Sequence, residues 1–505
     1  MPVVESRMIG VRMAAVAGVL LLAVSGCGGS SKKSPSASGH PSAQGTETDS
    51  QAPAIASQPM AQKDGPARVD LLSVDRSANN SVTVRWRVVN LGTKQMDLSR
   101  IMGRDNGKFT AQPVADGVSL VDATGEKRYF PYYNTSEQCL CSQTGDAKPQ
   151  PGKSAEFYAV LAAPPASVQQ TAVTIPLTPV FQGIPIGTKP RAVSGAEIDP
   201  AKGSLKPADI VPLISTVEGT DQATDDSGST RSVRLATDVL FAINKSELTP
   251  AAQAVLKQVA QQIDASSGST VKIDGYTDTT GNDSINNPLS VARAQAVQKQ
   301  LQSLVTRQGI TYQSNGHGSA DPIADNGTDV GRRKNRRVTV TFARPTPPAA
   351  APTAAATPTP TWTGGKLPVV ATATAQDPKL KDVKLEINSL HRDTTGLTTM
   401  TWTLTNNGSG RFSVAFTFVA PGQLGTYDGV TVSGATLVDS AAKLQYLTLR
   451  DETKGCICTR LNSGKGDLEA GDSVTYFDSY ELPSSLSGVD ISFPGFTKVT
   501  NVQVQ

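Results

Sequence analysis

The sequence predicts a multidomain protein in which a central α+β domain is flanked by two copies of an all-β domain. Three observations predict this fold class. A set of short features occurs twice, once before and once after the middle of the 505-residue chain. The middle itself combines the alternation typical of strands with the apolar spacing typical of amphipathic helices. Stretches rich in Ser, Pro, Ala and Thr separate these parts, as linkers do.

The repeated features keep their order along the chain. The strand-like stretch VRWRVVNLG of the first copy returns as MTWTLTNNG in the second, with a tryptophan at the same place of the alternating pattern. Leu-Val-Asp, which ends at Asp122 and at Asp439, precedes a Cys-x-Cys pair by the same interval in both copies. We therefore predict a duplicated β-sandwich of immunoglobulin-like architecture at residues 66–195 and 378–505, with the tryptophans in the two cores.

The repeats contain four cysteines that allow more than one chemistry: Cys139, Cys141, Cys456 and Cys458. Within a regular strand, residues two positions apart have Cα atoms about 6.6 Å apart, close to the upper limit for a disulfide, so a local bond requires a kink. The sequence predicts such a local structural disulfide in each copy. The alternatives are a bond between the copies and a thiolate site for a soft metal such as Cu(I) or for redox switching. A zinc site is disfavoured because no histidine lies near either pair.

The N-terminus has the features of a secretion signal. Arg7 and Arg12 precede an apolar run that is shorter than the roughly 20 residues of a membrane-spanning helix and that ends in small residues. The stretch LAVSGC resembles the bacterial lipobox. This resemblance implies a lipoprotein signal peptide at residues 1–27 and a lipid on Cys27, the mature N-terminus. The alternative is a fortuitous cysteine after an ordinary signal peptide.

Three segments are predicted to link the domains. Residues 28–65 contain almost no bulky apolar side chain to bury, so this segment is expected to be disordered. Residues 196–231 are polar and are expected to form an extended connector with one edge strand near residues 210–217. Residues 346–377 are dominated by Pro, Ala and Thr, which is typical of a semi-extended spacer.

The central domain, residues 232–345, is expected to alternate between strands and helices. Strands are predicted at residues 233–241, 271–276, 312–317 and 337–343. Thr249 is a good N-cap before Pro250, and apolar residues at helical spacing follow it. Ser290 is the natural N-cap of a second amphipathic helix. Two helices on one face of a small mixed sheet give an α+β fold.

A carboxylate and a guanidinium are expected to meet at one edge of this domain. With Ser290 as N-cap, Arg293 lies in the first helical turn, where the helix dipole disfavours a cation by about 0.3–1 kcal/mol. The guanidinium and the free N–H groups of that turn would instead face an anion. Asp278 follows the preceding strand at the same edge, so the pair suits a zwitterionic ligand. The alternative is a surface salt bridge worth about 0–1 kcal/mol.

Four motifs occur in order between residues 232 and 345: DVLFAINKSEL, GYTDTTG, NNPLSVARA and GRRKNRRV. In this order and spacing they resemble the OmpA-like peptidoglycan-associating domain, which binds the diaminopimelate residue of cell-wall stem peptides without covalent chemistry. The resemblance implies that Asp278 holds the ammonium group of the ligand and that Arg293 holds its carboxylate. It also implies polar support from Asn244, Thr280, Asn286 and Arg336. Tyr276 departs from the family, which usually has histidine at this position.

The sequence shows no signature of catalysis. Its three histidines fall in three different parts of the chain, so no metal cluster and no nucleophile–base pair is apparent. No cofactor is predicted, and the small net charge of +3 together with the secretion signal argues against nucleic acid as a partner. We therefore predict a binding protein and not an enzyme.

The main prediction is a lipid-anchored cell-envelope protein whose partner is peptidoglycan. A lipid on Cys27 would tie the chain to the outer leaflet of the cytoplasmic membrane in a Gram-positive cell, or to the outer membrane in a Gram-negative cell. The alternative is an adhesion, scaffold, redox or metal-binding function carried by the two β-domains, with the central domain only as a wall anchor. No motif specifies the protein partners of the β-domains.

Overall fold

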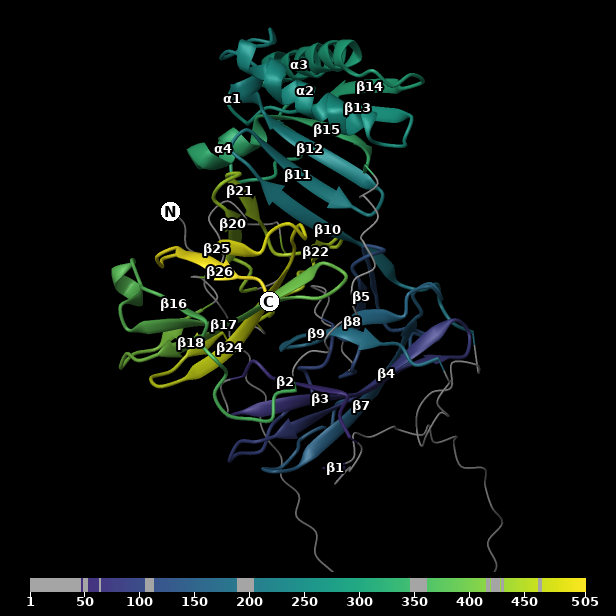
Figure 1. Cartoon of the computed structure of the whole chain (residues 1–505), viewed down its shortest axis with the longest axis vertical. Helices are drawn as coiled ribbons and strands as arrows, with labels where there is room; N and C mark the ends of the chain where they lie inside the picture. The colour runs from purple at the N-terminus through teal and green to yellow at the C-terminus, as the bar shows by residue number, and fades with distance from the viewer. Residues whose placement is uncertain are drawn as a thin grey trace, which may run out of the picture. The chain divides into compact units, whose positions relative to one another are not determined.

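The structure is a computed structural model of the chain. It describes residues 47–48, 53–62, 65–104, 113–188, 204–345, 361–414, 418, 427, 431–461 and 466–505 (Figure 1). These residues form a mostly β, multidomain protein with one α+β region. The predicted signal peptide and Cys27 lie outside the described residues. Within the described ranges, no helix combines the length and the apolar character needed to cross a membrane.

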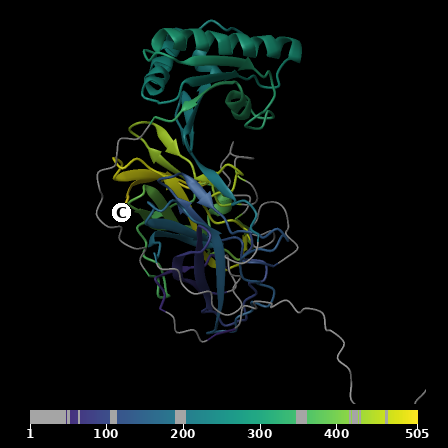
Figure 2. The same ribbon diagram turned by 90° about the vertical axis from the view of Figure 1, so that its right-hand side faces the viewer.

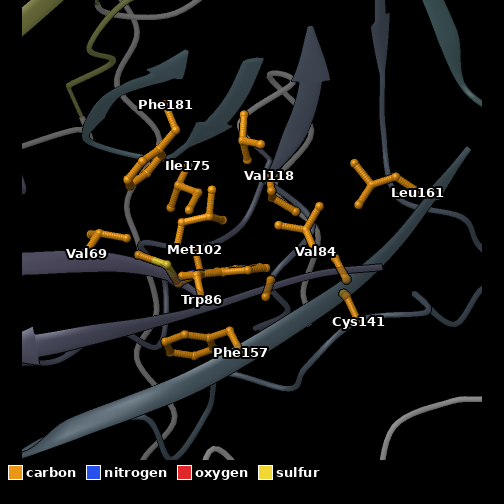
Figure 3. Close-up of a cluster of buried hydrophobic side chains, with 14 of the residues drawn as sticks. Val69, Val84, Trp86, Met102, Val118, Cys141, Phe157, Leu161, Ile175 and Phe181 are labelled. Atoms are coloured by element: carbon orange, nitrogen blue, oxygen red, sulfur yellow. The ribbon is translucent and has the colours of Figure 1, made fainter. Parts of the chain in front are cut away.

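The first β-rich region consists of two sheets that share one core. One sheet has the order β1 (Glu47–Thr48), β7 (Ser154–Ala162), β4 (Ser81–Asn90), β3 (Ala67–Ser77) and β2 (Ala56–Pro59). The other has the order β6 (Lys127–Tyr129), β5 (Ser119–Asp122), β8 (Gln170–Ile175) and β9 (Thr178–Pro185). Trp86 stacks on Phe157, with 5.7 Å between ring centroids, and Figure 3 shows it between Phe157 and Met102. The tryptophan is therefore a core residue, as predicted.

The second β-rich region has the same layered construction. Its first sheet has the order β16 (Ala371–Ala373), β17 (Val383–Arg392), β18 (Leu397–Asn406) and β24 (Ser473–Glu481). Its second sheet has the order β21 (Leu444–Tyr446), β20 (Thr436–Asp439), β25 (Gly488–Ser492) and β26 (Val499–Gln503). Short pieces complete it: η1 (Pro378–Leu380), β19 (Phe412–Ser413), β22 (Arg450–Asp451) and β23 (Asp467–Leu468). Trp402 is fully buried in this core.

The two β-rich regions share details of their backbone. Strands β4 and β18 have the same pattern of buried and half-buried residues along their length. The partner strands β3 and β17 break register at the same place, between Leu71 and Ser73 and between Ile387 and Ser389. Such a β-bulge inserts one extra residue into a strand and is a specific structural feature. Its recurrence agrees with the sequence repeat.

The central region is an α+β unit, as the sequence predicts. Its sheet has the order β14 (Thr311–Gly316), β13 (Thr270–Gly275), β15 (Arg337–Ala343) and β12 (Thr230–Ala236), with β13 and β14 parallel and the other pairs antiparallel. Its helices are α1 (Thr237–Leu240), α2 (Pro250–Asp264), α3 (Asp283–Leu304) and α4 (Asp329–Asn335). Figures 1 and 2 show α2 and α3 over one face of this sheet. The Thr249 side chain caps α2, as predicted, by accepting a hydrogen bond from the Ala252 N–H.

The N-terminus of α3 differs from the prediction. The helix begins at Asp283 because Asn282 caps it, accepting a hydrogen bond from the Ile285 N–H. Pro288 then lies in the second turn, where it removes one backbone hydrogen bond without ending the helix. Ser290 is fully buried inside the helix, and its hydroxyl accepts a hydrogen bond from the Gly318 N–H at 2.9 Å. The predicted Ser290 cap is wrong, and Arg293 therefore has no free helical N–H groups beside it.

The predicted strand at residues 233–241 is also shorter than expected. The strand β12 ends at Ala236, and α1 follows at once. Adjacent residues of a strand point to opposite faces of the sheet, so a strand would not bury Leu240 and Phe241 together. The helical turn allows both side chains to enter the central core.

The segments predicted as linkers contribute strands. Residues 196–231 contain two strands, β10 (Ile210–Glu218) and β11 (Gln222–Ser227), which extend the central sheet beyond β12. Strand β11 is polar, and ion pairs join it to β12: Asp225 with Arg234 at 2.9 Å and Asp226 with Arg231 at 2.6 Å. In residues 28–65, β2 forms an edge strand of the first β-rich region, and in residues 346–377, β16 forms an edge strand of the second. Strand β10 lies where a strand was expected near residues 210–217, but it is not an edge strand, because it pairs on both sides.

Strand β10 connects the three regions by backbone hydrogen bonds. Its first residues pair with β6 of the first β-rich region, and its middle and end pair with β22 and β21 of the second. Its later residues also pair with β11 of the central sheet. A central fragment that begins at residue 232 would therefore cut β12 and remove β10 and β11, so experiments on the central region need the whole chain.

Candidate functional site

Asp278 lies in the loop that follows β13, and it is only 6% exposed. Its Oδ2 accepts a hydrogen bond from Arg336 Nη1 at 2.7 Å, and its Oδ1 accepts one from the Thr280 N–H at 2.8 Å. Burial alone would raise the pKa of Asp278, but these donors hold its pKa below the ordinary value. The carboxylate is therefore ionised at neutral pH, and it keeps further lone pairs for a ligand.

Arg293 approaches the same place from the middle of α3 and is 4% exposed. Its Nε donates to the carbonyl oxygen of Lys245 at 3.0 Å, and its guanidinium lies 5.4 Å from the centre of the Phe241 ring. Burial lowers the pKa of Arg293, and the charges of Asp238, Arg336 and Asp278 also act on it. Among the described residues, its two terminal nitrogens have no hydrogen-bond acceptor. They are the groups that a ligand carboxylate would use.

Two glycines allow α3 to lie directly on the sheet. A Cβ at Gly275, the last residue of β13, would overlap the carbonyl oxygen of Ser290. A Cβ at Gly316, the last residue of β14, would overlap the backbone nitrogen of Val291. Because both strands end in glycine, the helix backbone approaches the strand ends closely. This close approach brings Arg293 to the edge from which the Asp278 loop leaves.

The predicted supporting residues have different roles. Asn286 is buried, and its Nδ2 donates to the Thr280 carbonyl oxygen at 3.2 Å and to the Asp278 carbonyl oxygen at 3.5 Å, so it braces the loop. Thr280 contributes its backbone N–H to Asp278, while its side chain is exposed. Asn244 is exposed and has a positive φ of 57° in the loop next to Lys245. The fold thus brings Asp278, Arg293, Asn286 and Thr280 to the same edge of the domain. Asn244 is connected to them only through the adjacent Lys245, whose carbonyl oxygen accepts the hydrogen bond from Arg293.

Arg336 is tied to two carboxylates of the protein. It pairs with Asp238 at 2.7 Å and with Asp278 at 2.7 Å, and the hydrogen bonds with Asp238 are the main cause of its raised pKa. Sequence reasoning missed the role of Asp238, although this residue opens the DVLFAINKSEL motif. It also missed the Lys245 carbonyl oxygen, because the backbone carbonyl of any residue type can accept a hydrogen bond.

Tyr276, the departure from the family pattern, is held between two other side chains. Its ring stacks on His317 with 4.8 Å between centroids, and the Arg337 guanidinium lies 3.7 Å from its ring centre. His317 in turn is fixed by Asp274, with 2.8 Å between Nε2 and Oδ1. These contacts are consistent with a structural role for His317.

In the structure both Cys-x-Cys pairs form local disulfides, Cys139 with Cys141 and Cys456 with Cys458. The Cα atoms of each pair are 5.2 Å apart, less than in a regular strand, so the backbone is kinked at both. All four cysteines are buried. In the part of the chain that the structure describes, no group of His, Cys, Asp and Glu residues is arranged to hold a metal ion.

Comparisons with known proteins bear on the region that carries this site. Residues 240–336 match the OmpA family. Outer membrane protein Omp38 of Acinetobacter baumannii is 35% identical over 160 residues, which are 30% of this chain and 45% of Omp38. Peptidoglycan-binding protein ArfA of Mycobacterium tuberculosis is 41% identical over 104 residues, which are 20% of this chain and 31% of ArfA. The matches thus span less than half the length of these two relatives.

A third relative is matched over most of its length. Putative lipoprotein YfiB of Escherichia coli is 37% identical over 123 residues, which are 24% of this chain but 75% of YfiB. Asp278 and Arg293 both lie within the residues that match the family. The chain therefore belongs to the OmpA family.

Proposed function

We propose that this protein is a cell-envelope protein that binds peptidoglycan non-covalently and without catalysis. The observation that carries the proposal is the meeting of a buried, ionised carboxylate, Asp278, with the buried guanidinium of Arg293. A similar relative of the central region is named a peptidoglycan-binding protein, which supports the proposal. The site offers opposite charges and no nucleophile–base pair, so its chemistry is recognition.

The proposed ligand group is the diaminopimelate of a stem peptide. Its ammonium group would bind the remaining lone pairs of Asp278, and its carboxylate would bind the terminal nitrogens of Arg293. In this proposal Asn286 and Thr280 hold the loop, Arg336 keeps Asp278 ionised, and Asn244 forms the exposed rim. Arg336 acts through Asp278, because its own donors are used by protein carboxylates.

A single site of this kind binds weakly. Two charge-assisted hydrogen-bond contacts contribute about 1.5–3 kcal/mol each, and the cost of immobilising the ligand offsets much of this gain. Retention in the envelope would come from two tethers acting together, a lipid on Cys27 and the repeating wall. The membrane concerned is the cytoplasmic membrane in a Gram-positive cell or the outer membrane in a Gram-negative cell.

The proposal also covers the N-terminal segment and the two β-rich regions. Residues 1–27 are a signal peptide, and the two β-rich regions are immunoglobulin-like sandwiches with one structural disulfide each. They are displayed from the wall by the central region. Their cysteines are used for stability in the oxidising space outside the cytoplasm.

Substitution of either charged residue should release the whole protein from the wall. Asp278→Asn keeps the shape of the side chain but removes its charge, and Arg293→Met keeps the stem but removes the guanidinium. Each should lower binding to purified sacculi roughly 10- to 100-fold, because one charge-assisted contact is lost. Co-sedimentation measures this, and free diaminopimelate should displace the wild-type protein.

The matched control is Lys299→Gln, which removes an exposed cation from α3 away from the site. It should bind as the wild type does, and thermal unfolding should verify that all three variants are folded. Undiminished co-sedimentation of both Asp278→Asn and Arg293→Met would overturn the proposal.

A further inference from the structure

A second charged cavity lies beside the proposed ligand site. It has a volume of about 240 Å³ and lies between the β10–β11 turn and α4. Two acidic residues, Glu218 and Asp221, line it from the turn. Five basic residues line the other sides: Arg234, Arg333, Lys334, Arg336 and Arg337. The turn lies outside residues 240–336, which match the family, and we call this cavity the hairpin pocket.

Protein carboxylates balance only part of this positive charge. Lys334 pairs with Glu218 at 3.0 Å, and Arg234 pairs with Asp225, outside the pocket lining, at 2.9 Å. Arg336 pairs with Asp238 and with Asp278, as described above. Three of the five cations therefore have a carboxylate partner.

The other two cations, Arg337 and Arg333, form no ion pair with any residue that the structure describes. Arg337 is only 6% exposed, and its hydrogen bonds go to the carbonyl oxygens of Asp321 at 3.0 Å and Asn335 at 3.3 Å. Burial lowers the pKa of Arg337, because the charged form loses its hydration. Arg333 is exposed at the rim. The charge of Asp321 and the Tyr276 ring, 3.7 Å away, act on Arg337 without forming an ion pair. A buried cation and a rim cation outside any ion pair favour an anionic ligand.

Arg336 joins the hairpin pocket to the proposed diaminopimelate site. The same side chain lines the pocket and donates to Asp278 Oδ2 at 2.7 Å. One arginine side chain spans roughly 7 Å, about the length of two residues of an extended peptide. A stem peptide held at Asp278 and Arg293 would therefore bring its neighbouring residues to the pocket.

We propose that the hairpin pocket is a second subsite, which binds another carboxylate of the same stem peptide. This inference rests on the proposed function. A carboxylate matches the planar fork of a guanidinium, and it is the anion that a bound stem peptide carries within reach. The β10–β11 hairpin would thus make the protein select longer wall peptides over free diaminopimelate.

The experiment compares two ligands on the whole protein: free diaminopimelate and the tripeptide L-Ala–D-Glu–diaminopimelate. Arg333→Gln removes the rim cation and should weaken tripeptide binding about two- to fivefold. Asp221→Asn removes an exposed carboxylate of the pocket and should strengthen tripeptide binding by a similar factor. Neither change should alter the affinity for free diaminopimelate, and Lys299→Gln should alter neither affinity. Isothermal titration measures all of these affinities.

The outcomes separate this inference from the proposed function. If diaminopimelate binds but both pocket variants bind the tripeptide as the wild type does, the second subsite is refuted and the proposed function stands. If the wild type binds neither ligand, both proposals fail. If inorganic phosphate occupies the pocket and the tripeptide gains nothing over diaminopimelate, the pocket is a phosphate site and the inference is overturned.

Discussion

Replacing Asp478 by asparagine should stabilise the protein at pH 8 by roughly 4 kcal/mol. Asp478 lies in β24 and is 0% exposed, next to Trp402. Its carboxylate accepts hydrogen bonds from Trp402 Nε1 at 2.9 Å and from the Thr448 hydroxyl at 3.2 Å. Burial nevertheless raises the pKa of Asp478 to about 7, because two neutral donors do not replace the hydration of a charge.

The direction of the pH dependence follows from the two states of this carboxyl group. In the unfolded chain its pKa is near 3.8, so it ionises there as the pH rises above about 4. In the folded protein it stays protonated until the pH approaches 7. The folded state therefore loses stability between pH 4 and pH 7, and the loss is complete above pH 7. Asparagine cannot ionise, so Asp478→Asn should lack this loss.

Chemical denaturation of both proteins at pH 4, 6 and 8 measures the effect. The gain from Asp478→Asn should be small at pH 4 and largest at pH 8. Asp490→Asn is the matched control in the same region, because the Ser440 hydroxyl, the Asn501 N–H and Lys498 lower the pKa of Asp490 to about 2. That carboxylate stabilises the fold above pH 4, so its replacement should destabilise the protein. An equal gain from Asp478→Asn at all three pH values would contradict the prediction.

The first β-rich region supplies an internal comparison. Ala159 of β7 occupies the place of Asp478, since both pair with the residue two positions before the core tryptophan. There the Trp86 Nε1 is buried and has no hydrogen-bond partner among the residues that the structure describes. The two copies thus differ at the indole N–H of the core tryptophan. In the first copy this donor is left without an acceptor among the described residues, and in the second it donates to a carboxyl group that ionises near pH 7.

Gly275→Ala should destabilise the central region by about 3 kcal/mol and abolish wall binding. The new methyl group would overlap the Ser290 carbonyl oxygen, which is backbone and cannot rotate away. Relief requires α3 to move off the sheet, and Arg293 moves with it. Gly316→Ala should have the same effect through the backbone of Val291.

Denaturation and sacculus co-sedimentation test this prediction together. The control is Gly410→Ala, because a Cβ at that glycine meets open space. It should leave both stability and binding within about 0.5 kcal/mol of the wild type. A Gly275→Ala protein with wild-type stability and wild-type binding would show that α3 does not depend on this close approach.

Local sequence signals were sufficient for much of the central region. The Thr249 cap, Pro250 and the apolar stripe of α2 act within a few residues of each other, so the sequence specifies them without the rest of the fold. The cap of α3 shows the limit of such signals. Asn282 and Ser290 are both suitable caps, and only the packing of Ser290 against Gly318 decides between them.

Strands without an apolar pattern were not visible in the sequence. Strand β11 is such a strand: ion pairs join it to β12, and backbone hydrogen bonds pair it with β10, the strand expected near residues 210–217. Backbone hydrogen bonds carry no residue signature, so a polar strand and a linker have the same composition. The hairpin pocket was missed for the same reason.

The sequence by itself determined the order of the regions, the repeat of the β-rich parts and, through its motifs, the identity of Asp278 and Arg293 as the candidate ligand pair. Tertiary structure alone decided which groups surround that pair: Arg336 on Asp278, Asp238 on Arg336 and the Lys245 carbonyl oxygen on Arg293. The physical reason is that residue type and local spacing specify helices and strands, whereas ion pairs form between any charges that the packing of distant segments brings together.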